Sequence, residues 1–225
     1  MHVIWDFDGP IAYSLPSYAR TIKRICEEGA RAFPNAGIHY PWTSLSALRR
    51  DISADFVRLY EQCGFTMDAH RGFIRRVWAH THNGVRLPLV PGIQRVLTSL
   101  HAGGVHMSLA TSRERAVTQR SLGSLVDLFY FATYGDNMPP KPHPGVLQTT
   151  LEKGGMDPTD CVYVCDTRAD VAMMPRIREN LGCAPEPIVV TYGWAAASQF
   201  ATSKVQLVHS VPELEALLLV RTKQS

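Results

Sequence analysis

The opening of the chain constrains its fold more than any other stretch. A short apolar run from Val3 to Trp5 leads directly into two carboxylates one residue apart, Asp6 and Asp8, and then into a Gly-Pro pair. An apolar run of this length that ends at a Gly-Pro breaker predicts a buried strand entering a tight turn. Two carboxylates held close together repel one another unless a cation or a shared proton relieves them. The stretch therefore predicts a divalent-metal site in which one carboxylate also acts as a nucleophile, although an acidic turn without a function would carry the same residues.

The overall composition is typical of a globular protein. The chain has 225 residues, of which 45% are hydrophobic and 19% charged, enough for one domain or for one domain with a small insertion. The net charge of +3 is dispersed, and no basic run is interleaved with aromatic residues, so we expect no nucleic-acid partner. No apolar segment approaches the roughly 18 residues needed to span a bilayer, and the first apolar run is too short for a signal peptide, so we expect no membrane partner. Five cysteines without paired metal spacing predict free thiols and a cytoplasmic protein.

The pattern of apolar residues divides the chain into a helical part and an alternating part. Helices are predicted over 13–33, 44–51, 53–63 and 68–81, with no convincing strand between residues 16 and 87. After residue 88, strands over 105–110, 129–133, 161–165, 188–191 and 205–208 alternate with helices over 93–100, 113–122, 145–153, 173–181 and 212–220. Alternation of this kind predicts an α/β fold, a Rossmann-like parallel sheet with helices on both faces. The helical part is then a small bundle inserted after the first strand.

Polar residues follow several of the predicted strands at the point where each strand ends. In a parallel sheet the ligand site lies beyond the carboxyl ends of the strands, so these residues are expected to converge there. They are Asp6 and Asp8 after the first strand, Thr111 and Ser112 after the strand over 105–110, Asp166 and Asp170 after the strand over 161–165, and Lys141 on a neighbouring loop.

The combination of these groups is the one that phosphoryl transfer needs, because the transferred group spreads negative charge over three oxygens. Mg²⁺ prefers hard oxygen ligands, here Asp6 and Asp166. Lys141 supplies a positive charge, and Thr111 with backbone N–H groups can hold phosphate oxygens. Asp8 can give a proton to the leaving oxygen and later take one from water.

Four ordered motifs resemble those of the haloacid dehalogenase-like (HAD) superfamily. They are Asp6-Phe7-Asp8-Gly9, Leu109-Ala110-Thr111-Ser112, Lys141-Pro142 and Val164-Cys165-Asp166-Thr167-Arg168-Ala169-Asp170. Within the superfamily the chain is similar to the phosphoglycolate phosphatase-like hydrolases. The stretches 89–93, 190–194 and 210–214 also resemble this branch. The resemblance covers nearly the whole chain.

The resemblance implies a role for each motif residue. Asp6 is then the nucleophile that forms an aspartyl-phosphate, and Asp8 is the general acid and base. Phosphate is bound by Thr111, Ser112 and Lys141, and Mg²⁺ by Asp6, the backbone carbonyl of Asp8, and Asp166, with Asp170 supporting Lys141 or a metal-bound water. The implied domains are an α/β core, residues 1–15 and 88–225, and a helical cap, residues 16–87, that closes over the substrate.

Two residues depart from the family pattern. Pro10 stands where the family most often has Thr, and Cys165 where it usually has Gly. Neither replaces a group with a chemical role, so we expect small effects. Asp8 is the informative residue, because dehalogenases of the superfamily lack this second acid. Its presence favours a phosphate ester as the substrate.

Other polar and aromatic residues have simpler interpretations. His106 is predicted to pack in the core, and His143 to lie in a loop without a role. The insertion is expected to place its arginines (Arg49, Arg50, Arg71, Arg75) on a solvated helix face and its aromatic residues (Tyr40, Trp42, Trp78) in its core. Arg113 and Arg168 flank the motifs, and the sequence leaves open whether they support the site or are exposed.

The predicted function is a Mg²⁺-dependent phosphatase acting on a small phosphorylated metabolite, a monoester like phosphoglycolate. A phosphomutase of the β-phosphoglucomutase type would share the motifs and the cap. A non-catalytic phospho-acceptor module, like the receiver domains of two-component signalling, is a third hypothesis, but its acceptor lies on a middle strand and it has no large insertion. The sequence leaves the substrate open, and the protein is expected to be a monomer or a homodimer.

Overall fold

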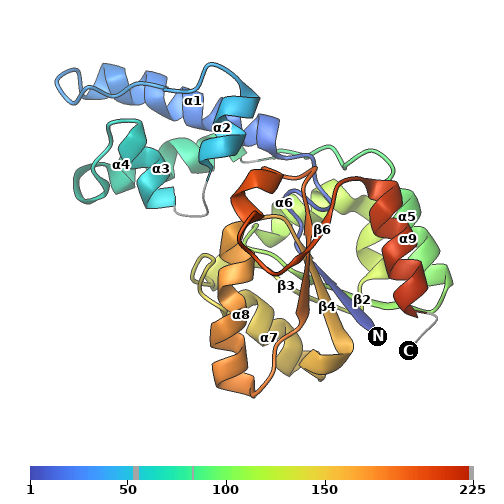
Figure 1. Ribbon diagram of the computed structural model, residues 1–225. Helices are drawn as coiled ribbons and strands as arrows, with labels where there is room; N and C mark the ends of the chain where they lie inside the picture. Colours follow the sequence, from blue (N-terminus) through green and yellow to red (C-terminus); the bar gives the residue numbers. More distant parts are fainter. Residues whose placement is uncertain (53–55, 83, 223–225) are drawn as a thin grey trace.

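A parallel sheet forms the centre of the structure, a computed structural model that describes residues 1–52, 56–82 and 84–222 (Figure 1). In the described residues its strands run in the order β3-β2-β1-β4-β5-β6. They are β1 (His2–Trp5), β2 (His106–Ala110), β3 (Phe131–Thr133), β4 (Cys161–Cys165), β5 (Glu186–Val190) and β6 (Gln206–Val208). Strand β1 lies between β2 and β4, with Trp5 opposite both Leu109 and Val164. The predicted Rossmann-like α/β fold with a parallel sheet is confirmed.

Helices cover both faces of the sheet because successive side chains of each strand point to opposite faces. Val3 and Trp5 pack with apolar residues of α5 (Ile93–Ala102), α6 (Arg115–Leu122) and α9 (Val211–Thr222). Ile4 points the other way, toward α7 (Gly145–Lys153) and α8 (Arg168–Leu181). Short 3₁₀ helices complete the connections: η1 (Gly123–Leu128), η2 (Gly135–Asn137), η3 (Pro158–Asp160) and η4 (Ala197–Phe200).

Among the described residues, four helices form a separate group beside the sheet (Figure 1). They are α1 (Leu15–Ala32), α2 (Leu45–Asp51), α3 (Phe56–Gln62) and α4 (Met67–His82), hereafter the helical insertion. The insertion has its own apolar cluster, which includes Ile22, Ile25 and Trp42. Each predicted helix of this region has a counterpart, although residues 53–55 of the predicted helix 53–63 lie outside the described residues. Trp42 lies in this cluster and Tyr40 and Trp78 pack against it, as expected.

The two ends of the insertion meet at one point of the core. The backbone N–H of Tyr13 donates to the carbonyl of Pro88 at 2.8 Å, and that of Val90 donates to the carbonyl of Ile11 at 2.8 Å. An antiparallel bridge joins Ala12 to Leu89 between them. The chain therefore leaves the core just after the Asp6–Asp8 turn and returns beside its exit.

The boundaries of most elements differ from the predicted ones by at least one residue, and at β3 and α8 the difference has a clear local cause. Strand β3 begins at Phe131 and not at residue 129, because the N–H of Phe129 still closes the last turn of η1. Helix α8 begins at Arg168, five residues before the predicted start, because Thr167 and Asp170 form a reciprocal capping box. The described part of the chain contains no helix that is both long and apolar enough to cross a membrane.

The prediction that His106 packs in the core is wrong. This residue is the first of β2 and is exposed, while the four that follow it are buried. The register places it opposite His2, and the two imidazole rings stack with 6.0 Å between their centroids. The first side chain of β2 thus lies at the amino end of the strand, outside the apolar core. The five cysteines are free thiols, as expected.

Candidate active site

The polar residues that follow the strands come together at the carboxyl edge of the sheet. Asp6 follows β1, Thr111 follows β2 and Asp166 follows β4. Asp170 lies in the first turn of α8, and Lys141 lies in the loop before α7. The convergence expected from parallel strand order is therefore present in the structure.

Lys141 joins two of the carboxylates. Its Nζ lies 2.8 Å from Oδ1 of Asp6 and 2.7 Å from Oδ1 of Asp170, and it donates to the hydroxyl of Tyr163 at 2.8 Å. These three contacts use all three N–H bonds of the ammonium group. Asp6 is only 5% exposed and also accepts the N–H of Phe7 at 2.8 Å. Asp6 is thus held by a cation and a backbone donor at the end of β1.

Asp170 is fixed from both sides. Its Oδ1 accepts the hydroxyl of Tyr163 at 3.0 Å in addition to the ammonium of Lys141. Its Oδ2 accepts the N–H of Thr167 at 3.0 Å and the hydroxyl of the same residue. An acid in the first turn of a helix is also favoured by the helix dipole. Asp170 is therefore held by more contacts than Asp6, and it positions Lys141.

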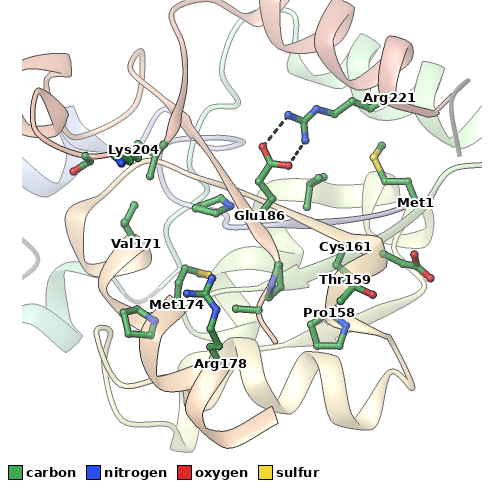
Figure 2. Close-up of a pocket in the computed structure, with 18 residues that line it drawn as sticks. Met1, Pro158, Thr159, Cys161, Val171, Met174, Arg178, Glu186, Lys204 and Arg221 are labelled. Carbon is green, nitrogen blue, oxygen red and sulfur yellow. Dashed lines mark hydrogen bonds and ion pairs between the residues drawn. The ribbon is translucent and has the colours of Figure 1, made fainter. Parts of the chain in front are cut away.

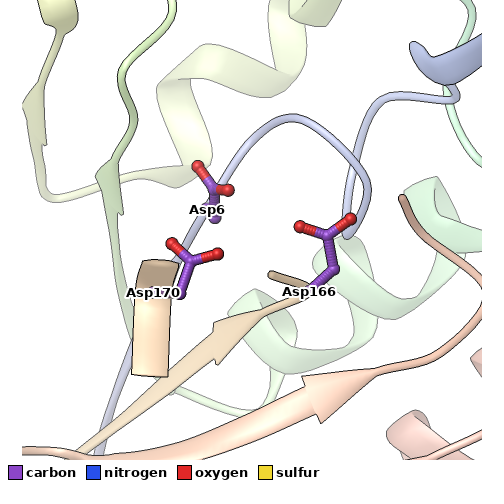
Figure 3. A group of neighbouring side chains, drawn as sticks. All are labelled: Asp6, Asp166 and Asp170. Carbon is purple, nitrogen blue, oxygen red and sulfur yellow. The ribbon is translucent and has the colours of Figure 1, made fainter. Parts of the chain in front are cut away.

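Asp166 completes a cluster of three buried carboxylates with Asp6 and Asp170, whose side chains point toward one another (Figure 3). One oxygen of each lies within 4.8 Å of the others. Oδ2 of Asp166 accepts the backbone N–H of Trp194, whereas Oδ1 is buried and has no hydrogen-bond partner among the described residues. Three carboxylates against one lysine leave negative charge unbalanced, and hard oxygen donors suit a divalent cation. The residues present fit a divalent-metal site.

Burial and charge shift the pKa values of these groups in different directions. Burial raises the pKa of Asp6 to about 7, although Lys141 opposes the shift. Burial also raises the pKa of Asp166, with Asp170 and Asp6 adding to the effect. Burial alone would raise the pKa of Asp170, but Lys141 together with the hydrogen bonds from Thr167 and Tyr163 outweighs it and lowers this pKa. Burial likewise opposes the charged form of Lys141, and the two carboxylates overcome it and raise the pKa of the ammonium.

Asp8 lies apart from the lysine and pairs with Arg113. The guanidinium donates from Nε to Oδ2 at 2.8 Å and from Nη2 to Oδ1 at 2.9 Å, a bidentate contact that engages both oxygens. The Arg113 side chain is 9% exposed, and its guanidinium lies 6.0 Å from the ring centroid of Trp78 in α4. The backbone N–H of Arg113 donates to the hydroxyl of Thr111 at 3.0 Å. Of the two flanking arginines, Arg113 thus supports the site.

The predicted phosphate-binding hydroxyls differ in their surroundings. Thr111 is buried, with its N–H bonded to the carbonyl of Thr133 at 3.1 Å. Ser112 is exposed. The structure therefore brings Thr111 into the linked group with Arg113 and Asp8 and leaves Ser112 at the surface.

A family model described as haloacid dehalogenase-like hydrolase matches residues 3–176. This chain belongs to the haloacid dehalogenase-like (HAD) hydrolase family. The matched range contains all seven predicted site residues.

Individual relatives agree with the HAD assignment. A phosphoglycolate phosphatase of Pseudomonas putida is 25% identical over 228 residues, which covers 96% of this chain and 78% of the relative. The solved structure of a predicted phosphatase from Clostridium acetobutylicum superposes with a TM-score of 0.77 at 19% identity, over 97% of this chain and 98% of that one. A Thermotoga maritima protein assigned as a β-phosphoglucomutase gives a TM-score of 0.60 at 19% identity, over 98% and 99% of the two chains. At these identities the solved structures show the fold alone.

The similarities confirm the resemblance to the phosphoglycolate phosphatase-like branch. The chain is an enzyme, a HAD-like phosphatase. The hypothesis of a non-catalytic phospho-acceptor module does not fit a member of this hydrolase family.

Three contacts of the HAD site were missed by sequence reasoning. Tyr163 bonds Lys141 and Asp170 from within β4, a strand buried on both faces whose apolar pattern gives no sign of a polar contact. Thr167 caps α8, and the pattern Thr-x-x-Asp was a readable signal for it. Trp194 comes from the segment after β5, and no local feature of the sequence connects it with Asp166.

The expectation that Arg49 lies on a solvated helix face is wrong. Its Nη2 donates to the backbone carbonyls of Thr191 and, at 3.3 Å, Ala195, both in the core. Arg50, the next residue, is exposed as expected. The difference arises because the C-terminal end of α2 packs on the segment after β5, a contact that a helical pattern cannot show.

A groove of about 1060 Å³ lies away from this site, around the amino ends of β4 and β5 (Figure 2). Cys161, Glu186 and Arg178 are among its lining residues, and Glu186 is paired with Arg221 across it. None of the predicted site residues lines it. In an α/β sheet of parallel strands the ligand site lies at the carboxyl edge, so the groove is not the active site.

Gly9 is required in the turn that carries Asp6 and Asp8. Its φ of +100° is a conformation that disfavours side chains, and an added Cβ would lie 1.8 Å from Oδ2 of Asp166. We expect Gly9→Ala to destabilise the protein by about 2–5 kcal/mol, from backbone strain and from displacement of Asp166. Gly155→Ala is the matched control, because Gly155 has a φ of +63° but open space around it, so only the strain of roughly 1–2 kcal/mol remains. Denaturant unfolding of both variants measures the difference, and equal losses would contradict the close approach to Asp166.

Proposed function

We propose that this HAD-like phosphatase hydrolyses a small phosphorylated metabolite, a monoester like phosphoglycolate, with Mg²⁺ and through an aspartyl-phosphate at Asp6. The observation that carries the proposal is the placement of Asp6 against Lys141, beside Asp166 and Asp170. A nucleophile, a cation for the transferred group and oxygen ligands for a metal are then in one buried site. The names of the curated relatives support phosphoglycolate as the first substrate to test.

In the proposed reaction a carboxylate oxygen of Asp6 attacks phosphorus, and the bond from phosphorus to the ester oxygen breaks. Both contacts of Asp6 described above use Oδ1, so Oδ2 is the oxygen available for attack. Lys141 offsets the negative charge that spreads over the phosphoryl oxygens. Water then attacks the aspartyl-phosphate, and inorganic phosphate leaves with Asp6 regenerated.

Asp8 is proposed to give a proton to the leaving oxygen in the first step and to take one from water in the second. Both of its oxygens accept hydrogen bonds from Arg113 in the structure. Each carboxylate oxygen keeps a second lone pair, so the leaving oxygen can approach Asp8 while the bonds from Arg113 are in place. Arg113 would keep Asp8 oriented through these bonds.

Mg²⁺ would be held by Asp6, Asp166 and the backbone carbonyl of Asp8. When bound, it would neutralise part of the charge on the carboxylates and on the phosphoryl group. The unpartnered Oδ1 of Asp166 supports this assignment, because a buried carboxylate oxygen without a donor is costly unless a cation is bound. Asp170 would act by holding Lys141.

The helical insertion is proposed to be a cap, residues 16–87, over a core of residues 1–15 and 88–225. The separate apolar cluster of the insertion and the meeting of its two ends at Ala12 and Leu89 support this division. We further propose that the enzyme acts in the cytoplasm on small molecules, as a monomer or homodimer, without nucleic-acid or membrane partners. The cytoplasmic location rests on the cysteine content, and the absence of a nucleic-acid partner rests on the dispersed charge.

The test is release of inorganic phosphate from phosphoglycolate and from a panel of phosphorylated metabolites, with Mg²⁺ or with chelator. We expect phosphate release that chelator abolishes and Mg²⁺ restores. An isomerised sugar phosphate in place of free phosphate would favour the mutase, which has the same fold. Activity that survives chelation would contradict the metal assignment.

The affinity for Mg²⁺ is expected to rise between pH 6 and pH 8. The pKa of Asp6 is about 7 in the metal-free protein, and that of Asp166 is also raised, so below pH 7 protons occupy ligands that the ion needs ionised. Each displaced proton weakens binding by about tenfold per pH unit below the pKa. Titration calorimetry at both pH values, in buffers of different ionisation enthalpy, measures the affinity and the protons released. An affinity independent of pH would contradict the raised pKa of Asp6.

A further inference from the structure

The segment of residues 191–200, which follows β5 and includes η4, touches both the carboxylate cluster and the helical insertion. On the core side, the backbone N–H of Trp194 donates to Oδ2 of Asp166. Gly193 lies so close that an added Cβ would be 2.3 Å from the same oxygen and 2.7 Å from Cβ of Asp166. The segment therefore fixes the orientation of Asp166 and leaves Oδ1 as the oxygen that has no hydrogen-bond partner in the described part of the chain.

The side chain of Trp194 belongs to the insertion, although the residue itself is part of the core. It is 7% exposed and lies in the apolar cluster of the insertion. Its indole N–H donates to the hydroxyl of Ser14 at 2.8 Å, just before α1 begins. Its ring lies 4.5 Å from that of Tyr18, between centroids, within α1. One residue thus carries both the donor to Asp166 and an anchor in the insertion.

Two polar side chains, those of Arg49 and Gln199, join the same segment to α2 by hydrogen bonds; the pair is called the clasp below. Arg49 donates from Nη2 to the carbonyls of Thr191 and Ala195, which flank Trp194. From the other side, Nε2 of Gln199 lies 3.1, 2.9 and 3.2 Å from the carbonyls of Arg49, Arg50 and Ile52. These bonds satisfy carbonyls at the end of α2 that the helix leaves free.

Two hydrogen-bonding atoms of the clasp lack a partner among the described residues. They are Nε of Arg49 and Oε1 of Gln199, and both are buried. Buried polar atoms without partners disfavour the docked state, because each would be solvated if the contact opened. The hydrogen bonds fix how α2 sits on the segment, but the two unpartnered atoms lower the stability of this contact.

We infer that docking of the helical insertion and metal binding at Asp166 are linked through this segment, with Trp194 as a positioning residue and Arg49 and Gln199 as the clasp. Movement of the insertion that withdraws the Trp194 ring also moves its N–H away from Asp166. The carboxylate then loses the contact that orients it toward Asp6. Linkage is reciprocal, so metal binding stabilises the docked insertion to the same extent. The inference rests on the metal assignment of the proposed function.

The first test compares Mg²⁺ affinity by titration calorimetry in the wild type, Arg49→Met, Gln199→Leu and the control Arg50→Met. None of the three substituted residues contacts the carboxylate cluster, and Arg50 is the exposed neighbour of Arg49. We expect about tenfold weaker binding in Arg49→Met and in Gln199→Leu, within the usual range of coupling between sites. Arg50→Met should bind Mg²⁺ as the wild type does. Circular dichroism shows whether each variant is folded. One clasp variant changes a side chain of α2 and the other a side chain of the segment, so the same loss in both would come from the contact between them.

The second test is the reciprocal effect, measured by hydrogen exchange with and without Mg²⁺. In the wild type, Mg²⁺ should slow exchange of amides in 191–200 and in α2, and this protection should be lost in Asp166→Asn. A purely structural clasp would give no Mg²⁺-dependent protection in α2. Wild-type affinity in both clasp variants would overturn the linkage and leave the proposed function intact. Failure of the wild type to bind Mg²⁺ would overturn the metal assignment and the linkage together.

Discussion

Asp6→Asn is expected to reduce phosphate release by about 10⁴-fold or more, the scale of effect found when an enzyme loses its nucleophile. The amide has nearly the shape of the carboxylate but cannot attack phosphorus. Lys141 retains its contact with Asp170, so the neighbouring groups should stay in place. The substitution also removes one of three mutually repelling carboxylates, so the fold should be retained. Steady-state phosphate release and circular dichroism measure the two properties.

The matched control for Asp6→Asn is Asp127→Asn, which makes the same chemical change at an exposed position in η1. It should leave the rate within about twofold of the wild type, because surface substitutions away from special contacts have small effects. Asp6→Asn with more than about one per cent of wild-type activity would contradict the nucleophile assignment. In that case the opening stretch of the chain would not carry the chemistry.

Lys141→Met is expected to abolish activity and also to destabilise the metal-free protein by about 3–5 kcal/mol, the usual cost of removing one partner of a buried ion pair. For a chain of this length that loss lowers the melting temperature by roughly 6–20 °C. Asp6 and Asp170 then lack their cation, so their pKa values rise above those of the unfolded chain. The folded variant binds more protons than the unfolded one, so the deficit should be larger at pH 8 than at pH 5.5. Thermal unfolding at both pH values measures this difference.

Lys204→Met serves as the control for Lys141→Met, because Lys204 is exposed and contributes nothing to the carboxylate cluster. It should melt within about 2 °C of the wild type at both pH values. Added Mg²⁺ should recover part of the stability that Lys141→Met loses, because a divalent cation also neutralises the cluster. A Lys141→Met protein as stable as the control would contradict the view that Lys141 holds buried carboxylates together.

The group of polar residues at the carboxyl edge of the sheet could be predicted from the sequence, because its position depends on local rules. Asp6 and Asp166 each follow an apolar run, and parallel strands bring their carboxyl ends together whatever the rest of the chain does. The same reasoning applies to the length of β4 and to the whole of α7, whose bounds agree with the predicted ones.

The contacts between the insertion and the core could not be predicted in this way. Arg49 and Trp194 look like ordinary helix and loop residues, and the carbonyls that the Arg49 side chain contacts lie 142 and 146 positions away in the sequence. Their roles depend on how the helical insertion and the α/β core meet, which no periodicity encodes. His106 was misplaced for a related reason, because an apolar strand pattern does not show where the sheet ends.

The two ends of the insertion lie side by side, which affects how such an enzyme can evolve. Because Tyr13 and Pro88 are hydrogen-bonded neighbours, a turn of a few residues could close the same gap that the four helices now span. The backbone of the Asp6–Asp8 turn would be the same with a longer, shorter or different insertion. On the proposed division into cap and core, selection on substrate choice can act on the insertion while selection on phosphate removal acts on the core. Chimaeras exchanged at these two positions would test whether the insertion carries the substrate preference.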